Sequence, residues 1–158
     1  MKTHIQVRSI GKPQEDWIKE AINMYATRCA PFGKIELIEL PEGHRGSAKP
    51  DVRKAMQTEA EHLLGKLPDD AYVIALDETG KQFSSTAFSG MIESEASNGR
   101  NLIFLIGGSW GLDAAVTKRA SMTLSLGKMT LPHSLARIVL LEQIYRAQMI
   151  GEGRKYHK

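Results

Sequence analysis

The segment Leu102-Ile-Phe-Leu-Ile-Gly-Gly-Ser-Trp-Gly-Leu112 decides the fold, because an unbroken apolar strand runs straight into small, turn-forming residues. A strand that is apolar at every position is typical of a parallel sheet covered on both faces. Gly107 and Gly108 have no Cβ atom, so a ligand can approach the main chain closely at this strand end. A tight turn with no ligand is the alternative for the same glycine pair.

A second segment, Leu124-Ser-Leu-Gly-Lys-Met-Thr-Leu-Pro-His133, has the same character, and a third apolar strand covers residues 71–76. Helical patterns alternate with these strands. This alternation predicts an α/β domain with a mostly parallel sheet flanked by helices. Ligands of such sheets bind beyond the carboxyl ends of the strands, so we expect a cleft where Leu76, 106–108 and 126–131 meet.

The spacing of apolar residues predicts the other elements. Strands are expected over 4–10, 35–40, 101–106 and 122–126, and helices over 14–29, 51–66, 84–97, 112–120 and 134–150. Asp51, and Ser84 or Ser85, are placed to cap helix N-termini. No repeat or linker interrupts the pattern, so we expect one domain over residues 1–158.

The helix predicted over 134–150 is apolar on more than one face, with Ile138, Leu141 and Ile144 among its residues. Such a helix must be buried on most of its sides. In a short chain a second subunit supplies that burial most easily, so we expect a homodimer with this helix in the interface. Burial within one subunit is the alternative.

Composition excludes several classes of protein. The chain of 158 residues contains no apolar run of membrane-spanning length, and its first residues show no signal-peptide pattern. Cys29 is the sole cysteine and falls on the apolar side of a predicted helix, which favours core packing over reactivity. We therefore expect a cytoplasmic protein with no membrane partner.

Basic residues gather in two places, which favours a polyanion such as RNA as a partner. One group follows the second strand, and the other lies at the C-terminus beside Tyr156 and His157. The residues are Arg45, Lys49, Arg53, Lys54, Arg154, Lys155 and Lys158. A solvated loop and a frayed tail are the alternative interpretation.

The cleft does not match the common nucleotide and metal motifs. Residues 107–111 lack the G-x-G-x-x-G spacing of dinucleotide sites, and no P-loop is present. The five histidines are scattered without the spacing of metal ligands, and no nucleophile elbow occurs. What remains is an adenosine-like pocket, in which apolar side chains flank a base and main-chain groups near Gly107, Gly127 and Met129 bind it.

Several motifs in fixed order resemble the ribosomal large-subunit pseudouridine N3-methyltransferases of the SPOUT class. They are Leu-Ile-Gly-Gly-Ser-x-Gly-Leu (105–112), Leu-Ser-x-x-Lys-Met-Thr-Leu-Pro-His (124–133), Arg137 with Leu141-Glu-Gln-x-Tyr-Arg146, and Tyr156-His157. The resemblance covers essentially the whole chain. It implies a C-terminal trefoil knot, which general topology rules disfavour, and a homodimer with the cofactor site beside the interface.

The resemblance also implies the reaction. The methyl donor is S-adenosyl-L-methionine, and the acceptor is N3 of a pseudouridine in helix 69 of 23S ribosomal RNA. Methylation takes place in the assembled ribosome, and neither DNA nor a metal is involved. The cofactor contacts carry over onto Leu76, Gly107, Leu126, Gly127, Lys128, Met129, Thr130 and Leu131, with Gly127 acting through its main chain.

Catalysis is expected to involve His157, Tyr156 and Arg154 on the tail. His157 is one candidate for removing the N3 proton, and His133 at the cofactor loop is the other. Tyr156 can stack on a base, and Arg154 can hold an RNA phosphate. For His133 the alternative is a local role at the start of the last helix, and for His157 a disordered tail.

Two arginines of the last helix have open roles, since Arg137 and Arg146 can each serve the interface or the RNA. A structural pair between Glu142 and Arg146 at helical i,i+4 spacing is the simpler alternative.

Two other functions remain in competition with RNA methylation. One is a non-enzymatic nucleotide-binding module associated with the ribosome, which would not need Tyr156 and His157. The other is a small-molecule enzyme with an adenosine cofactor, which would show no salt-sensitive affinity for RNA.

Overall fold

The computed structural model describes residues 3–44, 48–49 and 51–158. These residues form a five-stranded sheet in the order β2-β1-β4-β3-β5, and all of its strand pairs are parallel. The strands are β1 (Thr3–Ile10), β2 (Gly33–Leu40), β3 (Tyr72–Gln82), β4 (Leu102–Ile106) and β5 (Met122–Ser125). The predicted parallel α/β sheet is confirmed.

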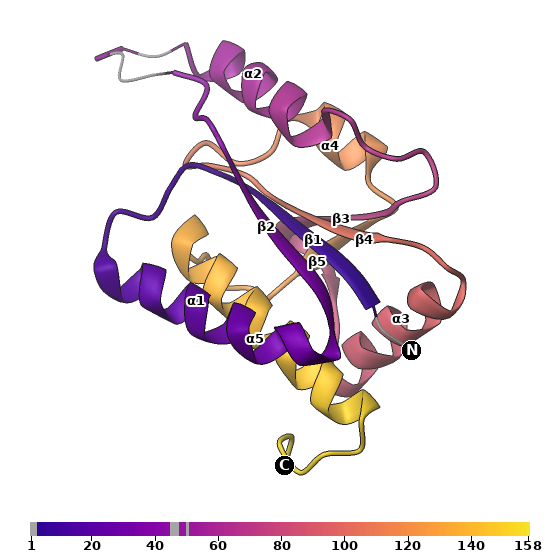
Figure 1. Ribbon diagram of the computed structural model, residues 1–158. Coiled ribbons are helices and arrows are strands. Elements are labelled where there is room, and N and C mark those ends of the chain that lie inside the picture. Colours follow the sequence, from indigo (N-terminus) through magenta and orange to yellow (C-terminus); the bar gives the residue numbers. More distant parts are fainter. Residues whose placement is uncertain (1–2, 45–47, 50) are drawn as a thin grey trace.

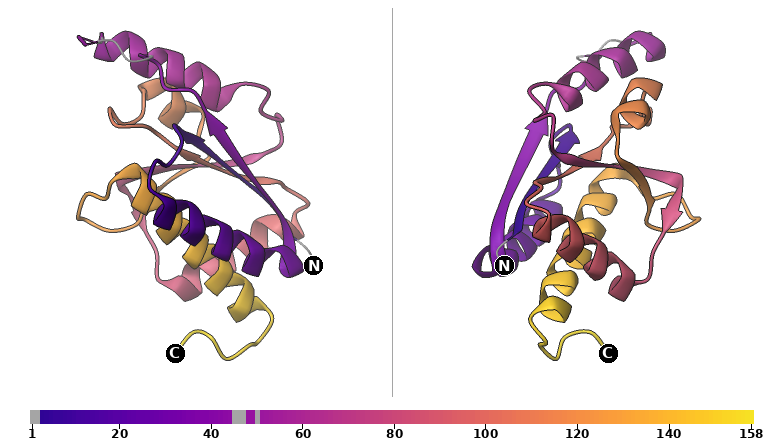
Figure 2. Two further views of the ribbon diagram at one scale, coloured as in Figure 1. Left: turned by 60° about the vertical axis from the view of Figure 1, so that its left-hand side comes forward. Right: turned by 90° about the vertical axis from the view of Figure 1, so that its right-hand side faces the viewer.

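Helices cover both faces of the sheet (Figure 1). One face carries α1 (Asp16–Cys29), α3 (Ser85–Ser97) and α5 (His133–Gly151), and the other carries α2 (Val52–Leu64) and α4 (Ala114–Arg119). A short 3-10 turn over Ala30–Phe32 follows α1. Figure 2 shows α5 running between α1 and α3, and it packs on both.

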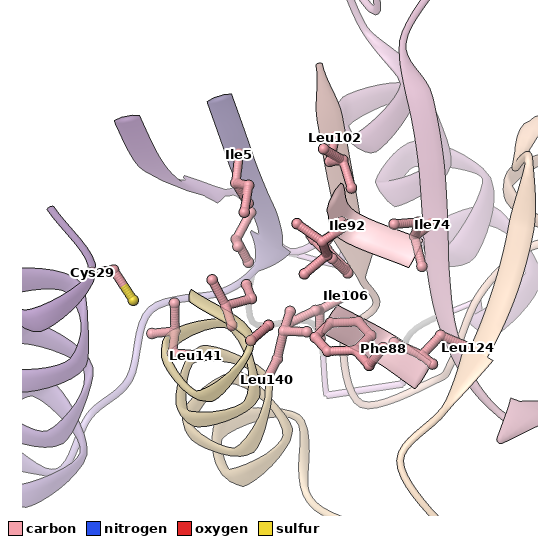
Figure 3. Close-up of a cluster of buried hydrophobic side chains, with 14 residues drawn as sticks. Ile5, Cys29, Ile74, Phe88, Ile92, Leu102, Ile106, Leu124, Leu140 and Leu141 are labelled. Atoms are coloured by element: carbon pink, nitrogen blue, oxygen red, sulfur yellow. The ribbon is translucent and has the colours of Figure 1, made fainter. Parts of the chain in front are cut away.

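Strand β4 lies at the centre of the sheet and is buried at every position, which explains its unbroken apolar sequence. Ile103 and Leu105 pack into a cluster beneath α2 and α4. Leu102, Phe104 and Ile106 pack into a second cluster with residues of α3 and α5 (Figure 3). The layered core therefore fixes the end of β4 between two packed faces.

Local signals in the sequence account for most element boundaries. Asp51 Oδ1 accepts a hydrogen bond from the backbone N–H of Lys54 at 3.2 Å, as expected for an N-cap. Ser84, rather than Ser85, caps α3 by accepting from the N–H of Ala87 at 3.1 Å.

The prediction that the third strand ends at Leu76 is wrong, since β3 continues to Gln82. Its pairing with β5 shifts register between Leu76 and Lys81. The register shift begins at Asp77, whose Oδ1 accepts the backbone N–H of Thr79 at 2.9 Å and forms a local turn. Gly80 then lies so close to Thr123 that an added Cβ would stand 2.7 Å from its backbone.

Helix α5 obtains part of its burial within one subunit. Its buried apolar residues, Leu140, Leu141, Ile144, Ala147 and Met149, face elements of the same chain. Other apolar residues of the helix, Leu135, Ile138, Val139, Tyr145 and Ile150, are only partly buried in one chain. The homodimer with this helix in its interface stays a prediction.

A long connection over 126–132 carries the chain from β5, at one edge of the sheet, to α5 between α1 and α3. The trefoil knot implied by the resemblance depends on how this connection threads past the other loops, and it stays a prediction.

Cys29 is completely buried at the end of α1, facing α5 (Figure 3). Burial raises the pKa of its thiol to about 12, so the predicted packing role is confirmed. Within the part of the chain that the structure describes, no helix has the combination of length and apolar character that a membrane crossing requires.

Candidate functional site

The register shift within β3 and the carboxyl ends of β4 and β5 surround a cavity of about 930 Å³. These strands are neighbours in the sheet, so these segments meet at one edge. The lining comprises Leu76, Asp77 and Glu78 at the register shift of β3, residues 106–112 with Leu124 at the ends of β4 and β5, and most of the loop that leads into α5.

All the predicted cofactor residues except Lys128 line this cavity: Leu76, Gly107, Leu126, Gly127, Met129, Thr130 and Leu131. Lys128 belongs to the same loop, but its side chain is exposed outside the lining. The cavity thus brings together the two segments that the sequence singled out.

The sequence predicts that Gly107 and Gly108 let a ligand approach the main chain, whereas the structure shows the chain itself in the space that a Cβ would need. A Cβ on Gly107 would lie 2.9 Å from Leu112 Cδ2 and 3.0 Å from the carbonyl oxygen of Gly111. A Cβ on Gly108 would lie 3.0 Å from Ile10 Cγ2. The chain's own tight turn therefore excludes side chains here, and the cavity lies beside that turn.

The loop after β5 is held in shape by its own side chains. Ser125 Oγ accepts the backbone N–H of Gly127 at 3.2 Å and donates to the carbonyl oxygen of Gly127 at 2.9 Å. Gly127 has a φ angle of +153°, which side chains rarely tolerate. Thr130 Oγ1 donates to Glu78 Oε2 at 2.5 Å and joins the loop to β3 at its register shift.

His133 begins α5 at the wall of the cavity and is half-buried. Burial, and next the charge of Arg137, lowers the pKa of His133 below its ordinary value. The neutral imidazole, which can accept a proton, is therefore favoured at neutral pH.

Arg137 is 4% exposed within one chain, and its role at the interface or toward RNA stays a prediction. Its Nη2 donates to the backbone carbonyls of Ile10 at 2.6 Å and Gly11 at 2.8 Å. It therefore ties the start of α5 to the end of β1, which is a structural role.

The C-terminal tail folds back onto the end of α5. Tyr156 donates a hydrogen bond to Glu142 Oε1 at 3.2 Å and meets the ring of Tyr145 edge-on. His157 Nδ1 lies 3.3 Å from Arg146 Nη1, and the guanidinium of Arg154 lies over the ring of Phe32. The alternative of a frayed tail is therefore wrong.

The simpler explanation for Arg146 is confirmed, because its Nη2 pairs with Glu142 Oε1 at 2.6 Å. Hydrogen bonding to Glu142 raises the pKa of Arg146, while burial raises the pKa of Tyr156. The pair also holds the tail, since Glu142 accepts from Tyr156 and Arg146 reaches His157.

Within one chain the tail and the cavity lie apart. His133 begins α5 at the cavity, whereas the tail folds back along the helix only as far as Arg146 and Glu142 (Figure 1). The part of the helix from His133 to Glu142 corresponds to roughly 14 Å. The structure does not bring His157, Tyr156 and Arg154 together with the predicted cofactor residues of the same chain.

Sequence reasoning missed three residues around the cavity. Glu59 is buried on the inner face of α2, four residues from both Ala55 and Leu63, and this helical spacing could have revealed it. Glu78 and Trp110 line the cavity, and Trp110 stands inside the very motif from which the prediction started.

The two predicted basic groups are exposed where the structure describes them. Lys49, Arg53 and Lys54 surround the start of α2, and Arg154, Lys155 and Lys158 lie on the tail. Arg45 lies outside the described residues. Across the described ranges, no group of three or more His, Cys, Asp or Glu side chains is arranged to hold a metal ion.

Comparisons with known proteins show which family has this architecture. The family described as "Predicted SPOUT methyltransferase" matches residues 1–157. A ribosomal RNA large subunit methyltransferase H from Streptococcus suis is 41% identical, and the match covers 98% of this chain and 99% of that protein. Proteins of the same name from Bacillus cytotoxicus and Streptococcus gordonii are each 43% identical with the same coverage.

A solved structure is also similar: the SpoU methyltransferase AviRb from Streptomyces viridochromogenes in complex with the cofactor AdoMet. It matches with a TM-score of 0.48 and 13% identity, covering 92% of this chain and 58% of that one.

Proposed function

The chain belongs to the SPOUT methyltransferase family, and we propose that it methylates N3 of a pseudouridine in helix 69 of 23S ribosomal RNA, with S-adenosyl-L-methionine as donor. The observation that carries the proposal is the cavity in which the two motif segments meet. The names of the relatives that are 41% to 43% identical support a large-subunit RNA as substrate.

The residues of the cavity suit an adenosine-bearing donor. Its volume of about 930 Å³ falls in the range of small-molecule sites. Leu76, Leu126 and Leu131 supply apolar walls for a base, and the main chain of 126–131 supplies hydrogen-bonding groups. The carboxylates of Asp77 and Glu78 line the same cavity and suit the positive charge of a sulfonium.

The donor supplies an electrophilic methyl group, so that an N–C bond forms at N3 as the C–S bond breaks and a thioether leaves. The protein must hold acceptor and donor in line, and alignment supplies much of the rate. The Ser125 and Thr130 hydrogen bonds fix the loop that would hold the donor. The N3 proton must leave to a base or to water.

His133 is the base that the cavity of one chain itself provides. Its lowered pKa keeps the imidazole neutral and able to accept a proton. His157 is the candidate on the tail, where it lies against Arg146. In the proposed mechanism the tail binds RNA, with Arg154 near a phosphate and Tyr156 near a base.

The separation of tail and cavity within one chain favours a second copy as the source of the tail, if both act on one nucleotide. We therefore propose a homodimer in which the tail of one subunit serves the cavity of the other. Trp17 and Met24 of α1 and Leu37 of β2 are exposed apolar side chains that a partner could cover. A second cavity of about 430 Å³ opens beside them, between α1 and β2.

Recognition of the RNA would depend largely on shape. All the described helices pack on one sheet, which leaves the exposed basic groups and the tail to meet the ribosome. A substrate within the assembled ribosome, the 70S particle or its large subunit, would place the activity in the cytoplasm. Methylation of a free stem-loop as efficiently as whole ribosomes would contradict the ribosome requirement.

The decisive experiment is transfer of labelled methyl groups from S-adenosyl-L-methionine to 70S ribosomes that lack this modification. We expect the label at one pseudouridine of helix 69, located by nuclease mapping and mass spectrometry. No transfer by correctly folded protein would overturn the proposal. A variant truncated after Gly153 should lose transfer, whereas a non-enzymatic binding module would keep its ribosome affinity unchanged.

A further inference from the structure

Trp110 presents an exposed indole at the cavity, in a turn that leaves it little freedom. Its side chain is 39% exposed and lines the same cavity as the β5–α5 loop. The turn is closed by a hydrogen bond of 3.1 Å from the N–H of Gly111 to the carbonyl oxygen of Gly108. The crowding at Gly107 and Gly108 holds the same turn against Leu112 and Ile10.

His44 supports the indole from the other side. Its ring meets Trp110 edge-on, with 6.1 Å between centroids and 75° between planes. His44 Nε2 also lies 3.3 Å from Glu42 Oε2. The indole is therefore held between its own turn and the loop that follows β2.

A single buried carboxylate lies between these two segments. Glu59 is 3% exposed, and its Oε2 accepts the N–H of Gly43 at 3.1 Å. Its other oxygen has no hydrogen-bond partner and faces Gly108, where a Cβ would lie 3.1 Å from it. Glu59 thus holds the loop bearing His44 and packs beside the turn bearing Trp110.

We propose that Trp110 stacks on a nucleobase of the RNA substrate, as a substrate-positioning residue; this rests on the proposed function. The acceptor nitrogen must come within about 3–3.5 Å of the methyl donor, so the target base must enter this cavity. Bases next to it then pass the rim, where Trp110 stands. Aromatic side chains bind unpaired bases by stacking on their faces.

Basic side chains near the His44 loop are placed to bind phosphates of the same RNA strand. Gly43 packs against Ala55, where an added Cβ would lie 2.2 Å from the carbonyl oxygen of Ala55, so the His44 loop lies on the first turns of α2. Arg53 and Lys54 are exposed at the start of that helix. They are available to phosphates of the strand whose base meets Trp110.

Fluorescence can test the contact directly, because the chain has two tryptophans. Trp17→Phe leaves Trp110 as the sole indole and keeps an aromatic ring on α1. We expect the emission of this variant to fall when a pseudouridine-containing helix 69 stem-loop is added with saturating S-adenosylhomocysteine. The matched variant Trp110→Phe, which retains Trp17, should show no such quenching.

Kinetics with 70S ribosomes supply the second readout. Trp110→Ala and Trp110→Leu should raise the KM for ribosomes by about 5- to 100-fold, the loss expected for one stacked base, while Trp110→Phe stays within about threefold of the parent. The Kd for S-adenosyl-L-methionine, measured by calorimetry, should stay unchanged.

Three results would overturn the stacking contact. They are an unchanged KM in Trp110→Ala, emission of Trp110 that stays unchanged although calorimetry shows the stem-loop bound, or a Kd for the donor that weakens in parallel with KM, which would place the indole against the donor. Failure of the proposed function looks different, since the unaltered protein would then transfer no methyl group at all.

Discussion

Thr130 and Glu78 join two sides of the cavity, because Thr130 Oγ1 donates to Glu78 Oε2 at 2.5 Å and so ties the β5–α5 loop to β3 at its register shift. Both residues line the cavity. The hydrogen bond fixes the loop whose main chain is proposed to hold the adenosine, and a fixed loop loses less conformational entropy when a ligand binds.

Replacing Thr130 by Val keeps the shape of the side chain and removes this bond. We expect Thr130→Val to weaken S-adenosylhomocysteine binding by about 3- to 10-fold, the effect of one charge-assisted hydrogen bond at an exposed position. Calorimetry measures the change. Thr117→Val is the matched control, since Thr117 donates to Ala114 within α4 and lies outside the cavity. Equal affinities of the two variants would contradict the expectation.

Mixed dimers can reveal which subunit supplies the tail. One chain carries Leu131→Glu in the cavity, and the other is truncated after Gly153. Each alone should be inactive, whereas a purified mixed dimer should recover about half the activity per dimer, because one of its two equivalent sites is intact. If the tail served the cavity of its own chain, the mixed dimer would stay inactive. Sedimentation confirms that all three species are dimers.

His133 should make stability depend on pH. Its pKa is lowered in the folded state, so the unfolded state binds more protons below the unfolded value of about 6.5. Its contribution is complete above that value and is lost as pH falls toward the folded pKa. Denaturant titrations from pH 7.5 to pH 5 should therefore show a smaller loss of stability for His133→Asn than for the parent. An NMR titration midpoint of His133 above 6.5 would contradict this.

The thiol of Cys29 should be unreactive in the folded protein. It is buried, and its pKa is raised to about 12, so little thiolate forms at pH 8. Ellman's reagent should react with it only after unfolding in guanidinium chloride. Fast reaction of the native protein would show that the packing of α1 on α5 opens readily.

Arg137 should matter for stability more than for RNA binding. Arg137→Ala leaves the carbonyl groups of Ile10 and Gly11 without their donor, and we expect a loss on the order of 3 kcal/mol. Urea denaturation measures it. The exposed Arg53→Ala is the control, expected to change stability by less than about 0.5 kcal/mol. A stable Arg137→Ala variant with weakened ribosome binding would reverse this assignment.

The elements of the fold could be predicted because local patterns and packing agree. β4 is apolar throughout and is buried on both faces, while Asp51 and Ser84 cap helices where the sequence places them. The extension of β3 could not be predicted in the same way. Its residues 77–82 are polar and turn-rich, and they pair only because β5 lies alongside after a register shift.

The candidate site was predictable in part for a similar reason. Strand ends of a parallel sheet meet at one edge, so Gly107 and the loop after β5 had to come together. The place of the tail was not predictable from motifs, since it depends on the direction and length of α5. The burial of Arg137 depends on carbonyl groups more than a hundred residues earlier in the chain, which no local pattern reveals.

The place of α5 also bears on how the chain folds during synthesis. This helix follows all the other described elements in the chain, yet it fills the space between α1 and α3, and Arg137 bonds to Ile10 across 127 residues of sequence. A nascent chain that lacks α5 exposes the apolar underside of β1 and β4, and contacts of such long range form late in folding. A newly made copy can thus complete its cavity only after the start of α5 has been synthesised and has packed on the sheet.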